Sequence, residues 1–455
     1  MDGVKVAFPI QQAMGHIGEI VGPELVEEQQ ANNHTSSYTI RASIVVAPET
    51  EEQVSHVLQF AHSNGYSVVT QGGGTKDAWG GHTGQADILL SMKNMSGILH
   101  HSIGDLMVTA LPGTTVKTLQ DALGQAGQFL PIDPSWSEQS TIGGMVAANG
   151  SGPKRALFGS ARDHLIATRV ALADGTVIRT GAKVVKNVAG YDMNKLFVGS
   201  MGTLGVLTEL TFKIRPLPAT TGLLAFGSNA SGDWKRIQEA LLDSQLEPCA
   251  AELVSPALAM KLFGSAQPEP ALVILFEDVD PSVSYQLEWL KTFAANIGLE
   301  PASECRGRTA TEPLIEHLRN IVPSANAIAP DRLVVSLKLL STMTEVSDIY
   351  EFANTSAAQL GCELYFSGGL FTGISYCTLD TEPNRTQDII QWIHGINAYM
   401  DQIHGAAIVA LAPVQVRSAV SVWGFARADG GLMKDIKQKL DSTHILNRGR
   451  FVGGI

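Results

Sequence analysis

The sequence predicts an α+β protein built from two unlike domains, and three observations support that prediction. From about residue 38 to 218, short β-branched runs alternate with segments of helical apolar spacing. A proline-marked boundary, RPLPAT, follows at 215–220. Beyond it, residues 219–430 alternate apolar strands with amphipathic helices, which is typical of an antiparallel sheet covered by helices on one face. A chain of 455 residues is also too long for one ordinary core.

The first elements follow from local signals. Residues 1–37 are expected to form an N-terminal arm or a small helical lead-in. The run RASIVVA at 41–47 predicts a strand because β-branched residues dominate it. Thr50 and Gln53 then have the spacing of a capping box, and Gly65 supplies a stop, so a helix is expected between them.

The rest of the first domain continues the same alternation. Its remaining expected elements are a strand at 67–70, a strand at 106–110, a helix at about 115–124, and a hairpin of strands at 165–172 and 176–180. The hairpin is indicated by the dipeptide Asp174-Gly175 between its two strands, because Asp-Gly favours the tight turns that match strand twist.

The second domain has longer apolar strands and longer helices. Its expected elements are strands at 271–276, 333–339 and 406–412, and helices near 281–297 and 344–360. Residues 431–455 form a separate tail, in which a basic helix precedes a glycine-rich turn.

Composition excludes several functional classes. The formal net charge is −12, which argues against a general binder of nucleic acid or of anionic membranes. The four cysteines are scattered without CxxC spacing, so the chain carries no cysteine-ligated cluster or zinc ribbon, and a reducing cytoplasm is expected. No signal peptide or membrane-spanning run occurs, although peripheral association with the inner face of a membrane through a complex is compatible with the sequence.

Three glycine-rich segments are the strongest functional signal. They are QGGGTKDAWGG at 71–81, TIGGMVAANGSGPKRALFGSARD at 141–163 and KNVAGYDMNKLFVGSMGTLGVLTEL at 186–210. Glycine lets the backbone lie directly on a ligand, so that consecutive N–H groups can form an anion-binding nest. A dinucleotide diphosphate suits such a surface. The glycine spacing fits neither a Rossmann fingerprint nor a P-loop; the alternative is that these glycines serve only turns.

Taken together, these motifs and the terminal HILNRGRF resemble the vanillyl-alcohol-oxidase/PCMH-type FAD-binding oxidoreductase family. Within that family the likeness is greatest to the smaller FAD-binding subunits of bacterial glycolate oxidases (glycolate dehydrogenases). The resemblance implies a two-subdomain PCMH-type FAD-binding domain at 38–218 and an α+β cap or substrate domain at 219–430. It also implies that residues 431–455 return to the FAD-binding domain.

The resemblance also implies which residues hold the cofactor. Residues Gly72, Gly73, Gly74 and Thr75 are expected at the diphosphate. The other expected FAD contacts are Pro134, Thr141, Gly143, Gly144, Val206 near the adenine or ribose, and Asn447 near the flavin ring. Some relatives attach the flavin covalently through a histidine after the glycine pair. Here Thr75 and Lys76 occupy that neighbourhood, so FAD is expected to bind non-covalently.

Two motifs depart from the family pattern. The usual GSEGTLG reads GSMGTLG, with Met201 in place of the acid, and the usual Asn-Pro-Gly reads Asn447-Arg448-Gly449. These differences affect the expected contacts around the flavin ring.

The catalytic residues are not identified by the sequence. A 2-hydroxy acid needs a cation for its carboxylate, and Arg319 in IEHLRNIV resembles the arginine with that role in related dehydrogenases; the alternative is a surface arginine paired with Glu316. Further candidates are Tyr191, Lys186 and His404. No metal site is expected, because His404 has no second histidine at ligand spacing and the pair at 100–101 is expected between strands, facing solvent.

The activity implied by the resemblance is oxidation of a small 2-hydroxy acid, glycolate to glyoxylate, by hydride transfer to flavin N5. The expected partners are a larger flavoprotein subunit and an iron–sulfur subunit. Two alternatives stay open: a non-catalytic FAD-binding scaffold or electron-relay subunit of such a complex, and a free-standing FAD oxidoreductase of another alcohol or a sugar acid.

Overall fold

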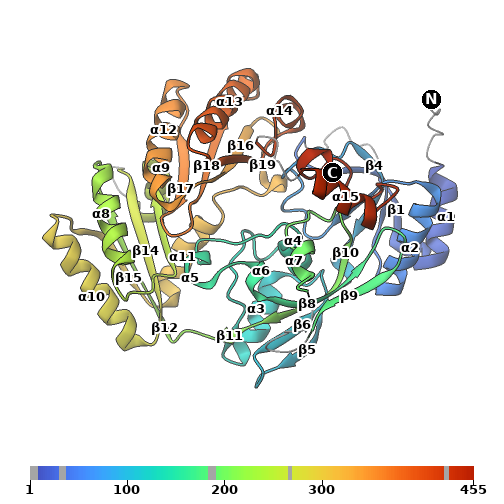
Figure 1. The fold of residues 1–455 in the computed structure, drawn as a ribbon, viewed down its shortest axis with the longest axis horizontal. Helices are drawn as coiled ribbons and strands as arrows, with labels where there is room; N and C mark the ends of the chain where they lie inside the picture. The colour runs from blue at the N-terminus through green and yellow to red at the C-terminus, as the bar shows by residue number, and fades with distance from the viewer. Residues whose placement is uncertain (1–8, 30–36, 183–190, 265–268, 425–429) are drawn as a thin grey trace.

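The computed structural model describes residues 9–29, 37–182, 191–264, 269–424 and 430–455. Figure 1 shows two lobes side by side: an N-terminal lobe containing three sheets and a second lobe built on one large sheet. Residues 183–190 fall outside the described part, and Lys186 with them.

The first sheet combines parallel and antiparallel strands in the order β1-β2-β4-β3. Its strands are β1 (Val26–Glu28), β2 (Arg41–Val46), β3 (Val68–Gln71) and β4 (Gln85–Ser91). Helices α1 (Ile10–Val21) and α2 (Glu51–Asn64) pack on it around Ile17, Val57 and Leu58. The predicted capping box is confirmed: Thr50 Oγ1 accepts from the Gln53 amide at 3.2 Å, and Gly65 caps the other end in the left-handed conformation.

The second sheet is antiparallel, in the order β5-β6-β10-β8-β9. Its strands are β5 (Ile98–Ser102), β6 (Met107–Ala110), β8 (Leu165–Ala171), β9 (Val177–Gly181) and β10 (Val206–Lys213). Its helices are α3 (Val116–Gln125), α4 (Ile142–Ala147), α5 (Arg155–Phe158), α6 (Ala161–His164) and α7 (Asn194–Phe197). A third, two-stranded sheet pairs β7 (Gln128–Phe129) with β11 (Arg215–Pro216).

Two predictions for this sheet have different outcomes. The hairpin of β8 and β9 is confirmed, with Gly175 at φ +86° in its turn. The expectation that His100 and His101 lie between strands is wrong, because both belong to β5 and pair with β6. His100 is exposed as expected, whereas His101 Nε2 lies 2.7 Å from Gln128 Oε1.

The second lobe is an eight-stranded antiparallel sheet in the order β15-β12-β14-β13-β17-β18-β16-β19. Its strands are β12 (Thr220–Gly227), β13 (Ala250–Val254), β14 (Ala271–Asp278), β15 (Pro301–Arg306), β16 (Leu333–Leu340), β17 (Leu364–Gly369), β18 (Ile374–Thr381) and β19 (Ala406–Leu411). Its helices are α8 (Ser231–Leu242), α9 (Pro256–Phe263), α10 (Asp280–Asn296), α11 (Arg308–Arg319), α12 (Val346–Gln359), α13 (Thr386–Gln402) and α14 (Val414–Ala419).

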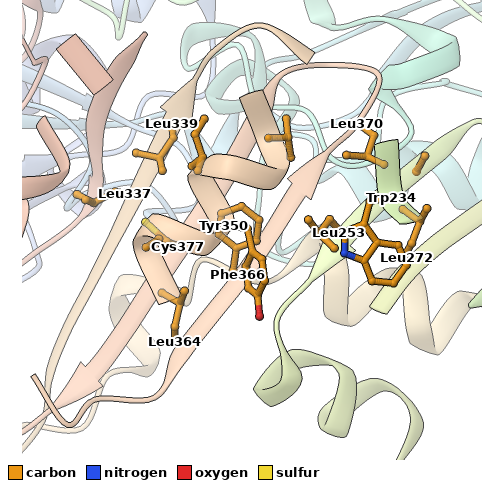
Figure 2. Packing of buried hydrophobic residues seen from close by; sticks show 14 of the residues in the cluster. Trp234, Leu253, Leu272, Leu337, Leu339, Tyr350, Leu364, Phe366, Leu370 and Cys377 are labelled. Carbon is orange, nitrogen blue, oxygen red and sulfur yellow. The ribbon is translucent and has the colours of Figure 1, made fainter. Parts of the chain in front are cut away.

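Helices α8, α10, α12 and α13 cover the outer face of this sheet (Figure 1). Trp234, Tyr350 and Phe366 fill the space beneath them, as Figure 2 shows. Each buried aromatic of this size contributes about 2–3 kcal/mol through apolar burial. The opposite face carries α9 and α11, and it packs on Phe158 of the first lobe. This second face of the sheet therefore lies toward the first lobe and can contribute residues to a site between the lobes.

The C-terminal tail lies on the first lobe, beyond α15 (Gly430–Leu440). Leu446 forms a parallel bridge with Val68, so the tail extends the first sheet next to β3. This bridge brings residues 447–450 against the glycine loop that follows β3.

Candidate functional site

The loop that follows β3 offers a run of free backbone donors. Within the described segments, none of the five amides of residues 72–76 donates to a protein acceptor. Unpaired amides need another acceptor when they are removed from water. Five successive ones form the kind of nest that binds an anion. The backbone of this loop can therefore donate several hydrogen bonds to an anion without help from side chains.

The carbonyl groups near this loop are bound to the tail. Arg450, which is 6% exposed, donates from Nη2 to the Lys76 carbonyl at 2.5 Å and from Nη1 to the Asp77 carbonyl at 3.2 Å. Asp77 in turn accepts from Gln71 at 2.6 Å. Arg450 was missed by the sequence interpretation, although it stands in the HILNRGRF motif. Its buried cation favours an anion locally, against the global charge of −12.

Glycine is required at two positions of the loop because another segment lies directly against it. A Cβ on Gly73 would fall 1.8 Å from the carbonyl oxygen of Gln139, and a Cβ on Gly72 would fall 2.1 Å from Thr141 Oγ1. Thr75 Oγ1 also lies 3.1 Å from Ser140 Oγ. The first glycine segment and the start of the second therefore form one continuous wall.

The second glycine segment contributes in a different way from the first. Its amides at 142, 143 and 144 already donate, respectively to the Thr114 carbonyl, the Pro112 carbonyl and Thr141 Oγ1. A Cβ on Gly143 would fall 2.7 Å from Pro112 Cβ. Gly143 thus allows close packing of α4, and the free donors come from residues 72–76 alone.

Two adjoining cavities open beside this wall. Both are lined by Thr70, Gln71, Gly72, Thr141 and Gly144. The first cavity is further lined by Gly73, Gly74, Thr75, Lys76, Met201 and Arg450, and the second by Gly143 and Val206. Eight of the ten expected cofactor residues therefore line these two adjoining cavities. Free amides and a buried guanidinium fit a dinucleotide diphosphate.

The other two expected cofactor residues lie beside these cavities. Asn447 is buried, and its amide is fully used: Oδ1 accepts from the Thr70 amide at 3.1 Å, and Nδ2 donates to Thr70 Oγ1 and to the Met201 carbonyl. It ties the tail to β3. Pro134 lines a separate cavity with Arg319. Both residues remain predictions as cofactor contacts.

A further cavity, here called the interdomain cavity, lies between the two lobes. Its polar lining comes from both: Ser151 and Arg155 from the first lobe, and Glu252, Arg319 and Tyr376 from the second. The lobes are joined beside it, where Trp136 Nε1 donates to the Val322 carbonyl at 2.9 Å and Ser135 donates to the Arg319 carbonyl at 2.6 Å.

Glu252 is an unusual residue for the middle of a strand. It is 6% exposed on β13, and its Oε2 accepts from Ser367 Oγ at 2.7 Å. Burial raises the pKa of Glu252 to about 8, and the Ser367 hydrogen bond offsets part of that rise. Burial likewise raises the pKa of nearby Asp133 to about 6. A carboxyl group that titrates near neutrality suits proton transfer.

Arg319 lies at this interdomain cavity, at the end of α11. Its Nη2 lies 2.9 Å from Glu312 Oε1. The alternative prediction, an ion pair with Glu316, is therefore wrong, because the partner is Glu312. The side chain is only 11% exposed, and its Nε has no hydrogen-bond partner within the described residues. Arg319 therefore keeps a buried, unused donor beside the cavity.

The two other catalytic candidates that the structure describes, Tyr191 and His404, lie away from these cavities. Tyr191 is 92% exposed, and His404 is exposed in the turn before β19 at φ +55°. Neither lines the cavities described above. In the part of the chain that the structure describes, no group of three histidine, cysteine or acidic side chains could hold a metal, and no helix is long and apolar enough to cross a bilayer.

Three residues at or beside the interdomain cavity were missed by sequence interpretation: Glu252, Lys338 and Tyr376. The signal for the first two was present, because each places a charge inside an apolar strand, AAELV at 250–254 and LVVSLKLL at 333–340. Such a charge is expected to be paired or functional. Their convergence with Arg155 depends on the packing of the two lobes and has no local signature.

Comparisons with known proteins identify the cofactor. Residues 42–181 match a family model described as an FAD binding domain. The chain is 32% identical over 243 residues to glycolate oxidase subunit GlcD of Bacillus subtilis (strain 168), which covers 52% of either protein. It is 41% identical over 169 residues to glycolate oxidase subunit GlcE of Escherichia coli (strain K12), covering 37% of this chain and 46% of that protein. The chain spans about half the length of these curated relatives.

The fold is shared over almost the whole chain. The crystal structure of p-cresol methylhydroxylase with substrate bound superposes with a TM-score of 0.75 at 14% identity, covering 98% of this chain and 97% of that one. The predicted α+β fold, the predicted family resemblance and FAD as cofactor are confirmed by these comparisons. The glycine cradle at 72–76 and 140–144 fits that cofactor.

Proposed function

We propose that this chain, a member of the vanillyl-alcohol-oxidase/PCMH-type FAD-binding oxidoreductases, oxidises a small 2-hydroxy acid, with glycolate to glyoxylate as the leading reaction. One observation carries the proposal. Next to the cofactor cradle, the interdomain cavity combines cations, Arg155 and Arg319, with a buried carboxyl group, Glu252. A 2-hydroxy acid needs both: a positive group for its carboxylate and an acceptor for its hydroxyl proton.

Oxidation of glycolate removes a hydride from C2 and a proton from the hydroxyl oxygen, and the carbon–oxygen bond becomes a carbonyl. When bound, FAD supplies the acceptor for that hydride. The chain's own residues have two tasks. The guanidinium of Arg319, which lines the cavity, orients the substrate carboxylate. Glu252 takes the hydroxyl proton on Oε1, since Oε2 is held by Ser367.

Assembly is part of the proposal. The relatives named above are two different subunits of glycolate oxidases, so we propose that this chain works beside a larger flavoprotein subunit. None of its cysteines is in a disulfide within the described residues, and they are too scattered to hold a cluster, so an iron–sulfur subunit would pass electrons onward. A cytoplasmic location, with peripheral attachment through the complex, is proposed on the same basis.

Two alternatives make different predictions. A non-catalytic scaffold or relay subunit would bind FAD without being reduced by any small acid. A free-standing oxidoreductase of another alcohol or a sugar acid would be reduced as a single purified chain by that compound. The buried charges of the interdomain cavity favour an enzyme, because a scaffold has no need of a buried carboxyl group with a pKa near neutrality.

Anaerobic mixing of the FAD-loaded protein with glycolate tests the proposal, first with the single chain and then with the assembled complex. The expected result is bleaching of the flavin absorbance at a rate that saturates with glycolate. Flavin that stays oxidised in both preparations, while another acid or alcohol reduces it, would contradict glycolate as the substrate. Flavin that no compound reduces would favour the scaffold.

A further inference from the structure

The boundary between the cofactor cradle and the interdomain cavity holds two lysines from different lobes. Lys76 ends the glycine loop, and Lys338 projects from β16 in the second lobe. Both ammonium groups lie over the ring of Trp79, with Nζ at 5.1 Å and 5.8 Å from its centroid. The ring of Tyr376 lies 6.0 Å from Lys338 Nζ. Two cations from different lobes thus lie near one aromatic ring.

Within the described segments, no carboxylate forms an ion pair with Lys76, Lys338 or Arg155. The charged groups that act on Lys338 are Arg155 and Lys76, and both repel it. Lys76 lines the cofactor cavity, Arg155 lines the interdomain cavity, and the charges of both act on the buried ammonium of Lys338. Like charges brought together without a counterion cost free energy unless an anion joins them.

Cofactor phosphates are not the best match for this cluster. The free amides of 72–76 and Arg450 lie at the proposed diphosphate cavity, which Lys76 also lines but Lys338 and Arg155 do not. Arg155 and Tyr376 line the interdomain cavity instead. Three neighbouring cations, two of them beside the ring of Trp79, suit a small planar anion, and a carboxylate is planar.

We infer that Lys76, Lys338 and Arg155 form the binding site for the carboxylate of a small organic acid, held against Trp79 between the two lobes. In taking that acid to be the substrate, the inference rests on the proposed function. Lys338 then shares the substrate carboxylate with Arg319, which lines the same cavity as Arg155. Because the site draws one lysine from each lobe, the bound anion also links the lobes.

Oxalate is the probe, because it carries the carboxylates but has no C–H bond to lose as hydride. Its dissociation constant is measured on the FAD-loaded protein from the change in flavin absorbance and by calorimetry. We expect Lys338→Met to raise that constant by about tenfold or more, with FAD content unchanged. The matched control is Lys261→Met, which removes another lysine stacked on an aromatic ring, Tyr365 at 3.9 Å, outside this site; its constant should stay within about twofold of the parent's.

Several results would overturn the inference: no oxalate binding to the parent, an unchanged constant in Lys338→Met, or loss of FAD from Lys338→Met, which would assign the cation to the cofactor. Oxalate binding that depends on Lys338, in a protein that glycolate does not reduce, supports the inference and contradicts the proposed substrate. The two claims can therefore fail separately.

A test on the parent protein covers the case in which the variants do not fold. Burial lowers the pKa of Lys76 and of Lys338 to about 8, so oxalate affinity should fall by about tenfold or more between pH 7 and pH 9. Among the facing groups, Glu252 on β13 has a pKa raised to about 8 and adds repulsion over the same range. Two other facing groups keep their charge state there: Tyr376 on β18, whose pKa is raised, and Asp133, with a pKa of about 6. Arg155 on α5 is the remaining facing cation. Affinity independent of pH would overturn the inference.

Discussion

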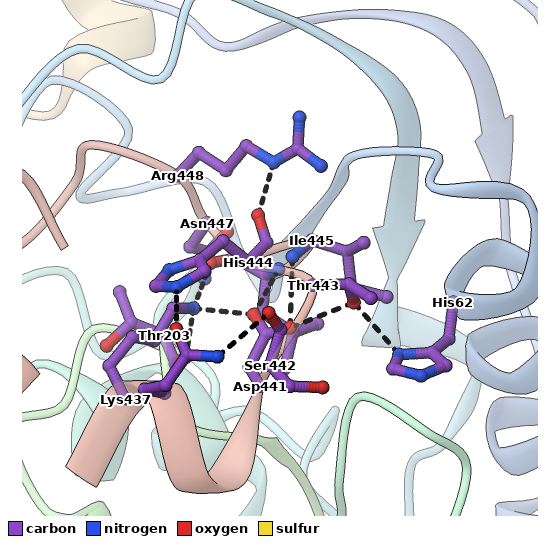
Figure 3. Close-up of polar contacts among 12 residues, drawn as sticks. His62, Thr203, Lys437, Asp441, Ser442, Thr443, His444, Ile445, Asn447 and Arg448 are labelled. Carbon is purple, nitrogen blue, oxygen red and sulfur yellow. Dashed lines mark hydrogen bonds and ion pairs between the residues drawn. The ribbon is translucent and has the colours of Figure 1, made fainter. Parts of the chain in front are cut away.

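The ammonium of Lys437 lies 2.6 Å from a carboxylate oxygen of Asp441, and the two side chains are 1% and 0% exposed (Figure 3). Lys437 also donates to the carbonyls of Thr203 and Leu446, at 2.7 and 2.9 Å. Asp441 accepts from the Ile445 and Leu446 amides. The pair is fully satisfied by hydrogen bonds, and it fixes the tail to the segment around Thr203. Asn447 and Arg450, which contact β3 and the glycine loop, follow directly from this anchor.

Breaking this pair should destabilise the protein strongly. Lys437→Met leaves the Asp441 carboxylate buried without its counterion, which typically costs about 3–5 kcal/mol. The free energy of unfolding from urea titration should fall by that amount. Lys439→Met, two residues along the same helix, is the control and should change it by less than about 0.5 kcal/mol. Equal stability of the two variants would show that the anchor contributes nothing.

Gly73→Ala should abolish the cofactor cradle. The added Cβ would meet the Gln139 carbonyl oxygen at 1.8 Å, so the loop must move and its free amides with it. FAD affinity should fall by about 100-fold or more, equivalent to the loss of one or two charge-assisted hydrogen bonds. Fluorescence titration of the flavin-free protein measures it. Gly104→Ala, where a Cβ meets nothing within 4 Å, should bind FAD like the parent.

Glu252→Gln should slow flavin reduction without affecting FAD content. The amide keeps the shape of the side chain but cannot accept the hydroxyl proton, so the rate at saturating glycolate should fall by about 100-fold or more. Stopped-flow absorbance under anaerobic conditions measures it. Glu363→Gln, an exposed carboxylate that accepts from Tyr365, should react at the parent's rate. A fully active Glu252→Gln would remove this residue from the mechanism.

The same substitution has a stability signature that does not depend on activity. The folded-state pKa of Glu252 is raised from 4.5 to about 8, so the folded protein holds this proton more tightly than the unfolded chain does. The parent is expected to lose stability as pH rises from about 4.5 through about 8, because the buried carboxylate must ionise. Glu252→Gln has no such loss. Its unfolding free energy should therefore exceed the parent's by a few kcal/mol at pH 9 and match it at pH 4.5.

Arg319→Ala should weaken substrate binding. Loss of the guanidinium beside the interdomain cavity is expected to raise KM for glycolate by about tenfold or more, with FAD content retained. Steady-state kinetics of the assembled complex measure it. Arg332→Ala removes an exposed arginine paired with Asp380 and should leave KM unchanged. An unchanged KM in Arg319→Ala would assign the carboxylate to other residues.

Non-covalent attachment of FAD is tested by acid precipitation. Thr75 and Lys76 provide no histidine at the position where some relatives attach the flavin, so the yellow chromophore should remain in the supernatant. A yellow pellet that survives washing would contradict this prediction.

Local chemistry made the elements of the fold predictable. The capping box at Thr50, the left-handed stop at Gly65 and the Asp174-Gly175 turn each depend on a few neighbouring residues, and each was confirmed. His100 and His101 were misassigned because polar residues in an edge strand lack the apolar alternation that marks a half-buried strand.

The site was predictable only where a motif is continuous in sequence. The glycine loop could be recognised because its proposed function depends on consecutive backbone amides. The sequence did not indicate that the amides at the start of α4 are already hydrogen-bonded, because their acceptors at Pro112 and Thr114 lie about 30 residues away. Glu252, Lys338 and Arg155 come from three distant segments, and their proximity follows from the docking of the lobes.

Titration of the flavin-free protein with FAD, and in parallel with riboflavin, tests the central claim most directly. If the amides of residues 72–76 hold the diphosphate, FAD should bind at least about 100-fold more tightly than riboflavin, which lacks it. Equal affinity for the two compounds, or a correctly folded protein that binds neither, would contradict the account.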